Sequence, residues 1–150
     1  MKNKVLILLF ALAISTVSFG ASWSAKWIQA ADCKNEVNTW QVFRKTINLA
    51  TVSKQMTAKI AVDSKYWLWI NGRMVVFEGG LKRGPSPWDT YVDEVNIGPY
   101  LRKGGNTIAL LTVYFGKEGF SHKSSGHGAL LFEAGTGKMT IISDETWESA

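Results

Sequence analysis

The chain has one cysteine, Cys33, among its 150 residues, which excludes an internal disulfide. It also has no apolar run as long as the roughly 20 residues that a membrane-spanning helix requires. The net charge is +5, but the basic residues are scattered rather than clustered, so nucleic acid is a poor candidate partner. After residue 22, no long segment combines helical spacing of apolar residues with a capping residue. These absences favour a domain of β-structure that is held together by its hydrophobic core.

The first residues have the form of a secretory signal peptide. Two lysines precede a nearly unbroken apolar run over residues 5–14, and Ser18 and Gly20 place small residues at positions −3 and −1 of a cleavage site. A lipoprotein signal would need a cysteine directly after the cleavage site, and Cys33 lies well beyond it. We therefore predict a signal peptide over residues 1–20 and export to the periplasm, the cell surface or the medium, with no membrane span after cleavage.

The remaining residues, 21–150, have the size of one domain with one core. Removing two lysines from 17 basic residues leaves 15 against 12 acidic ones, so the net charge of this part is about +3. Short runs rich in β-branched and aromatic residues recur along it, and polar turn residues separate them. This pattern predicts an all-β fold, an antiparallel β-sandwich or jelly roll. The predicted strands are residues 41–49, 57–62, 66–70, 73–77, 93–97, 106–115, 129–133 and 139–143.

The strongest local signal is the Asn71-Gly72 pair between two of these runs. A two-residue type I′ turn needs positive φ at both central positions, and Asn-Gly tolerates this best. We therefore predict a β-hairpin over residues 66–77. Its first strand, residues 66–70, is apolar on both faces, which predicts a central strand that is covered on both sides.

Two loops, residues 78–91 and 116–128, are longer than a hairpin requires, and long loops on a rigid sheet scaffold often bind ligands. The first combines cations, aromatic rings and a carboxylate, a mixture that suits sugars because rings stack on aromatic faces while hydroxyls bond to charged groups. Two prolines restrict its backbone. The second loop has two histidines. The candidate carbohydrate-binding residues are Lys82, Arg83, Trp88, Asp89, Tyr91, His122 and His127.

The same residues also have a structural interpretation. Trp88 and Tyr91 would then anchor the first loop to the sandwich, while Lys82 and Arg83 remain solvated. The histidines of the second loop would serve the structure of that loop. The sequence leaves both interpretations open.

No pattern in the sequence predicts catalysis or metal binding. Asp93 and Glu94 are adjacent, so on a strand they point to opposite faces, unlike the paired carboxylates of glycosidases. His122 and His127 have no cysteine or carboxylate between them to complete a metal site, and a Ser-His pair needs a third group that orients the base. We therefore assign no catalytic residue, no metal ligand and no cofactor; Ca²⁺ is conceivable, but no motif supports it.

A series of short motifs runs through nearly all of residues 21–150. They are Trp27-Ile28, Phe43-Arg44-Lys45, Tyr66 to Gly72, Gly80 to Pro85, Asp89-Thr90-Tyr91, Tyr100-Leu101, Gly105-Asn106-Thr107-Ile108, and Ser143-Asp144 with Trp147. In order and spacing they resemble the N-terminal region of bacterial α-L-rhamnosidase-like glycoside hydrolases. The resemblance implies a galactose-binding-like β-sandwich. In that family the sandwich precedes a helical (α/α)6 catalytic barrel with the acid and base glutamates, and none of these glutamates has a matching position here.

The resemblance also implies a function. It predicts an exported, non-catalytic carbohydrate-recognition or accessory domain, truncated at its C-terminus and lacking the last strands of the sandwich. The implied partners are a rhamnose-containing oligosaccharide or polysaccharide and a missing downstream catalytic domain that hydrolyses terminal α-L-rhamnosyl linkages. Two alternatives remain: a stand-alone exported carbohydrate-binding protein, and a purely structural spacer.

Overall fold

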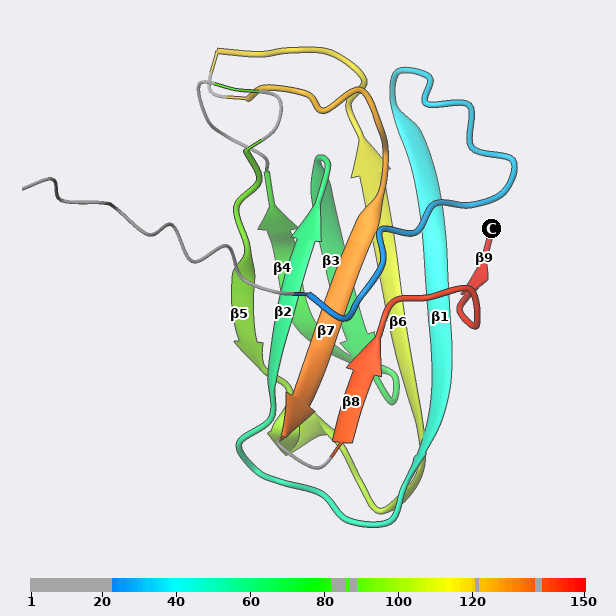
Figure 1. Cartoon of the computed structure of the whole chain (residues 1–150), viewed down its shortest axis with the longest axis vertical. Helices are drawn as coiled ribbons and strands as arrows, with labels where there is room; N and C mark the ends of the chain where they lie inside the picture. The colour runs from blue at the N-terminus through cyan, green and yellow to red at the C-terminus, as the bar shows by residue number, and fades with distance from the viewer. Residues whose placement is uncertain (1–22, 82–85, 87–88, 121, 137–138) are drawn as a thin grey trace, which may run out of the picture.

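The computed structural model describes residues 23–81, 86, 89–120, 122–136 and 139–150, and these form two antiparallel sheets packed face to face (Figure 1). The predicted signal peptide lies outside the described residues. The described elements are β1 (Thr39–Leu49), β2 (Thr57–Val62), β3 (Lys65–Ile70), β4 (Arg73–Gly80), β5 (Asp93–Asn96), the 3-10 helix η1 (Gly98–Tyr100), β6 (Gly104–Tyr114), β7 (Leu130–Thr136), β8 (Met139–Ile142) and β9 (Glu148–Ser149). The prediction of an all-β sandwich is confirmed. None of the described residues belong to a helix that could span a bilayer.

One sheet has five strands in the order β4-β3-β6-β1-β9, and the other has four in the order β5-β2-β7-β8. The core lies between them and receives buried side chains from both sheets, among them Phe43, Ile60, Leu68, Leu110 and Phe132. The inward positions alternate with more exposed ones along β1 and β3, as a strand with one buried face requires. The described strands therefore enclose one hydrophobic core.

All eight predicted strands are present, with ends that differ by a few residues. The ninth, β9, was not predicted. It has two residues and pairs with β1 through Phe43 opposite Ser149 and Arg44 opposite Glu148. Two residues are too few to show an alternation of apolar and polar side chains. The strand forms only because these residues lie beside the edge of β1.

The β3–β4 hairpin turns at Asn71 and Gly72, whose φ angles of 52° and 76° are both positive, and this prediction is confirmed. The Asn71 side chain also extends to neighbouring segments. Its amide nitrogen donates to the Tyr100 carbonyl and to Oδ1 of Asn106, both at 2.9 Å, and its own Oδ1 accepts from the Thr107 backbone at 3.0 Å. This residue therefore shapes the turn and ties it to β6 as well.

The prediction that residues 66–70 are covered on both sides was correct for one side only. β3 lies between β4 and β6, and Tyr66, Leu68 and Ile70 are buried in the core. Trp67 and Trp69 point to the opposite side, where no other layer of the described part of the chain covers them. We call this side of the five-stranded sheet the outer face. Its apolar side chains include Trp40, Val42, Trp67, Trp69, Met74, Phe77 and Leu111.

Candidate functional site

The loops over residues 78–91 and 116–128 lie at the same end of the sandwich, at the top of Figure 1. We call this end the loop end. Of the seven candidate residues, Lys82, Arg83 and Trp88 lie outside the described residues. The described candidates are Asp89, Tyr91, His122 and His127.

The base of the first loop is fixed by the buried side chain of Tyr66. Its hydroxyl donates to Oδ2 of Asp93 at 2.9 Å, and the same oxygen accepts from the Gly80 backbone at 2.8 Å. Burial, together with the adjacent Asp93 carboxylate, raises the pKa of the Tyr66 hydroxyl far above its usual range, so it remains a donor. Gly79 makes room for the ring, because a Cβ there would lie 2.4 Å from Cζ of Tyr66. The Asp93 carboxylate therefore joins the two ends of the loop, because Asp93 follows the loop and its side chain bonds to Gly80 before it.

The base of the second loop is fixed by Asp63, which is 4% exposed and directly follows β2. Its Oδ2 accepts from the backbone and hydroxyl of Ser125 at 2.6 and 2.7 Å, and from the Ser124 hydroxyl at 3.3 Å. Its Oδ1 accepts from the Ser64 hydroxyl at 2.7 Å. A buried carboxylate needs such donors to offset the loss of hydration. Asp63 thus anchors the loop to the sandwich.

His122 belongs to this anchor and is itself only 6% exposed. Its Nε2 lies 3.4 Å from Oδ1 of Asp63 and 3.3 Å from the Ser64 hydroxyl, and its ring meets Phe115 edge-on with centroids 5.5 Å apart. Serine, histidine and aspartate are the residue types of a hydrolytic triad. In a triad, however, the histidine separates the other two. Here Ser64 donates directly to Asp63 and is fully buried, so this group has the geometry of a structural anchor.

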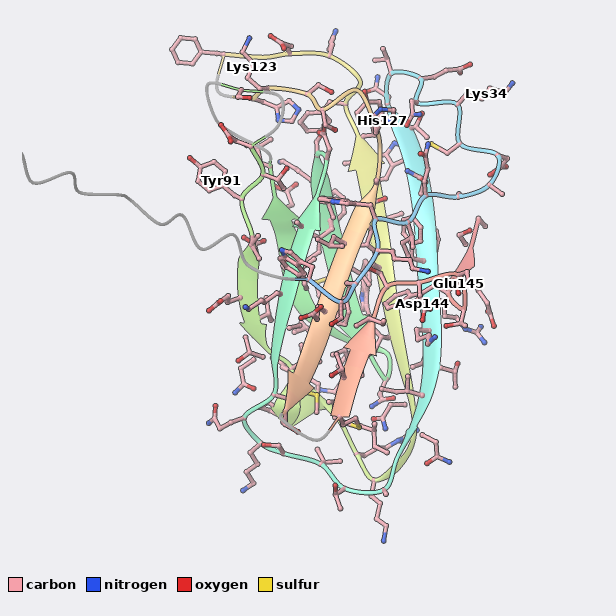
Figure 2. All side chains as sticks on the ribbon, viewed as in Figure 1. Lys34, Tyr91, Lys123, His127, Asp144 and Glu145 are labelled. Carbon is pink, nitrogen blue, oxygen red and sulfur yellow. The ribbon has the colours of Figure 1, made fainter. Side chains whose placement is uncertain are left out.

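The other candidates are accessible. Asp89 is exposed, Tyr91 is 60% exposed, and His127 is exposed, with its backbone held by the Ser125 hydroxyl. Figure 2 shows Tyr91 and His127 on opposite sides of the loop end. The second loop also presents Phe120, whose ring is fully exposed and which was not predicted as a site residue. Its only signal in the sequence is an aromatic residue between polar loop residues.

The carboxylates near the first loop do not form a pair. Asp93 is partly buried and holds Tyr66 and Gly80, whereas the neighbouring Glu94 is exposed. Within the described ranges, no group of three or more His, Cys, Asp or Glu side chains could hold a metal ion. The described part of the loop end therefore offers aromatic surface and hydrogen-bonding groups, which suit binding.

Among solved structures, the chain is similar to a GH78 family rhamnosidase of Bacillus sp. GL1, with 31% identity and a TM-score of 0.76 over 87% of the present chain. It is also similar in fold to an α-L-rhamnosidase of Streptomyces avermitilis, solved with L-rhamnose, at 19% identity and a TM-score of 0.59 over 84% of the chain. A lectin of Pleurotus ostreatus, solved with GalNAc, matches at 17% identity and a TM-score of 0.52 over 83%.

The chain spans only 14%, 12% and 35% of these three proteins, respectively. No protein-family model matches the sequence, and neither does any curated protein. The two more distant likenesses concern the fold alone, whereas the Bacillus enzyme matches in sequence as well. The chain is a β-sandwich similar to one domain of GH78-family α-L-rhamnosidases.

Proposed function

We propose that this chain is a non-catalytic accessory domain of an exported α-L-rhamnosidase-type glycoside hydrolase. The observation that supports this most directly is the 31% identity to the Bacillus enzyme over 87% of the present chain, which corresponds to only 14% of that enzyme. Hydrolysis of terminal α-L-rhamnosyl linkages would then belong to a domain outside this sequence. Export rests on the predicted signal peptide.

The environment of the described carboxylates supports a non-catalytic role. Glycoside hydrolysis needs two carboxyl groups that face each other across the scissile bond. Asp63 and Asp93 are both occupied by internal hydrogen bonds. Asp144 and Glu145 are neighbours in the chain, and each is paired with a lysine. None of these arrangements provides an acid and a base on opposite sides of a substrate.

The outer face supports attachment to a larger protein. Trp40 is 55% and Phe77 is 71% exposed, and Trp67 lies between them, stacked on Trp40 at 5.6 Å and edge-on to Phe77 at 6.5 Å between centroids. A contiguous apolar surface of this kind marks an interaction site on a soluble protein. Because the similar enzymes are several times longer, we assign this face to contact with another domain of the same longer chain.

The loop end is the candidate carbohydrate contact. Exposed Tyr91 and Phe120 present aromatic faces there, and Asp89 and His127 present polar groups. Lys82, Arg83 and Trp88 remain candidates on the first loop. A rhamnose-containing oligosaccharide is the ligand class that the similarity to rhamnosidases suggests.

Hydrolysis of 4-nitrophenyl α-L-rhamnopyranoside tests the central proposal. We expect no hydrolysis above the uncatalysed rate by the chain alone, and hydrolysis by the product of a longer reading frame that contains it. Rhamnosidase activity of the isolated chain would contradict the proposal. So would a stop codon directly after Ala150 in a genome region without a hydrolase gene.

The assignment of the outer face needs a separate test in the longer protein. Replacing Trp40 and Phe77 by serine should leave the isolated chain folded, because both side chains are exposed. In the longer enzyme, the same double variant should expose the domain boundary to limited proteolysis. Equal cleavage of the wild type and the variant would exclude this face as the domain contact.

A further inference from the structure

A cleft away from the loop end lies beside β1. It has a volume of about 390 Å³ and its lining includes Trp27, Gln29, Phe43, Asp144, Glu145 and Trp147. We call it the side cleft. Its volume is within the range of about 300–1,000 Å³ that is typical of small-molecule sites. Figure 2 labels Asp144 and Glu145, which lie between β8 and β9.

The walls of the side cleft are held in place by backbone hydrogen bonds. The Lys26 nitrogen donates to the Ser143 carbonyl at 2.8 Å, and the buried Ser143 hydroxyl donates back to the Lys26 carbonyl at 2.6 Å. Two residues further along, Ile28 pairs with Leu130 of β7. Trp27 stands between these two fixed positions and is 50% exposed. The protein therefore presents a half-exposed indole on a preformed backbone, which lowers the entropy lost when a ligand binds.

The base of the side cleft is aromatic. Phe43 and Trp147 line it and are almost fully buried, so only small parts of their rings reach the opening. The Trp147 indole donates to the Ile142 carbonyl at 2.7 Å, and its ring packs on Phe132 with centroids 5.5 Å apart. These contacts fix the position of the base. An apolar base with polar walls is the usual composition of a small-molecule site.

The charges around the cleft balance one another. Lys26 lies 3.2 Å from Glu145, and Lys45 lies 3.5 Å from Asp144, which gives two cations and two anions. Oδ1 of Asp144 accepts hydrogen bonds from Lys45 Nζ at 3.5 Å and from the Thr146 backbone at 3.0 Å, whereas Oδ2 accepts none from the described residues. The hydrogen bond from the Thr146 hydroxyl, aided by Lys45, lowers the pKa of the Asp144 carboxyl, so it is an ionised acceptor at neutral pH.

We propose that the side cleft binds a neutral pyranoside, one sugar unit of an oligosaccharide. The Trp27 indole would stack on the apolar C–H face of the ring, and Oδ2 of Asp144 would accept hydrogen bonds from ring hydroxyls. The balanced charges disfavour an ionic ligand, and the polar walls disfavour a purely apolar one. This site is separate from the loop end. It adds a second sugar site to the one proposed at the loop end, and it can be tested in this chain without the longer enzyme.

Titration followed by ¹H–¹⁵N NMR tests the proposal, with methyl α-L-rhamnopyranoside, methyl β-D-galactopyranoside and methyl α-D-glucopyranoside as probes. We expect at least one probe to produce saturable shifts of the Trp27 indole signal and the Asp144 amide, with a Kd on the order of 1 mM. Trp27→Ala should weaken this binding about tenfold or more. Asp144→Asn should weaken it as well, and circular dichroism will show whether that variant is folded.

The matched control is Trp40→Ala, because Trp40 has nearly the same exposure as Trp27, 55% against 50%, and does not line the side cleft. It should leave the binding unchanged, as should Tyr91→Ala at the loop end. An equal loss with Trp40→Ala would overturn the proposal. So would the absence of saturable shifts for all three sugars up to about 50 mM, far above the expected Kd of about 1 mM. Binding of an uncharged acetylated, amidated triglycine in place of the sugars would also overturn it.

Discussion

Replacing Asp63 by alanine removes the acceptor that anchors the second loop. This one carboxylate accepts four hydrogen bonds, from Ser64, Ser124 and the backbone and hydroxyl of Ser125. His122 also loses its 3.4 Å contact. The alanine side chain has no acceptor, so the partly buried Ser125 backbone N–H loses its partner.

The size of the effect follows from the kind of bond that is lost. A hydrogen bond to a charged group contributes about 1.5–3 kcal/mol, and a buried donor left without a partner costs about 1–3 kcal/mol. Both Ser125 bonds involve the same residue and the same oxygen, so their contributions to the free energy of unfolding do not add fully. We therefore expect Asp63→Ala to lower the free energy of unfolding by about 3–5 kcal/mol. Asp63→Asn keeps the shape and one acceptor oxygen, and should lower it by about 2 kcal/mol.

Urea unfolding followed by tryptophan fluorescence measures these differences. The control is Asp89→Ala, which removes an exposed carboxylate from the other loop and should change the free energy of unfolding by no more than about 0.5 kcal/mol. Hydrogen exchange should also show that the Asp63 variants lose protection at the Ser125 amide before the sheets do. If Asp63→Ala costs no more than Asp89→Ala, the anchor that we describe does not hold the loop.

Three further predictions concern the fold, the acidic turn and export. Gly79→Ala should lower the free energy of unfolding, measured by urea unfolding, by about 1–3 kcal/mol, because the new Cβ would lie 2.4 Å from Tyr66. Gly105→Ala, with open space around it, should be nearly neutral in the same assay. The lowered pKa of Asp144 means that its contribution to stability is complete above its ordinary pKa of 3.8 and is lost as the pH falls through the lower folded value. Asp144→Asn should remove that part of the pH dependence in urea titrations between neutral and acidic pH. Mass spectrometry of the exported protein should find Ala21 at the N-terminus, and a retained N-terminal methionine would contradict the predicted signal peptide.

The strands could be predicted because their signals are local. Residues 57–62 alternate in hydrophobicity, and Asn71-Gly72 fits one turn type, so both predictions depend on neighbours in the chain. The prediction of a β-sandwich follows from the same pattern. β9 has no such signal, since two residues become a strand only beside the edge of β1.

The sites were harder to predict because their contacts join residues that are distant in the sequence. Asp63 meets Ser125 across 62 positions, and Lys26 meets Glu145 across 119. His122 could be noticed as a polar residue in a loop, but its burial depends on Asp63 and Ser64, which the sequence does not place beside it. Aromatic residues are also ambiguous in a sequence. Only the structure separates a buried Trp147 from a half-exposed Trp27.

The pairing of β1 with β6 has a consequence for the order of folding. Their register joins Leu49 to Gly104 and Thr39 to Tyr114, so each pair closes a loop of 55 to 75 residues. The β3–β4 hairpin closes over two residues and can form within about 1–10 μs, whereas closing so long a loop is entropically costly and slow. During synthesis β1 appears before β6, so its edges stay unpaired until β6 has been added to the chain. For the export that we propose, this delay would be useful, because the sheet that fixes the sandwich cannot close until β6 has emerged.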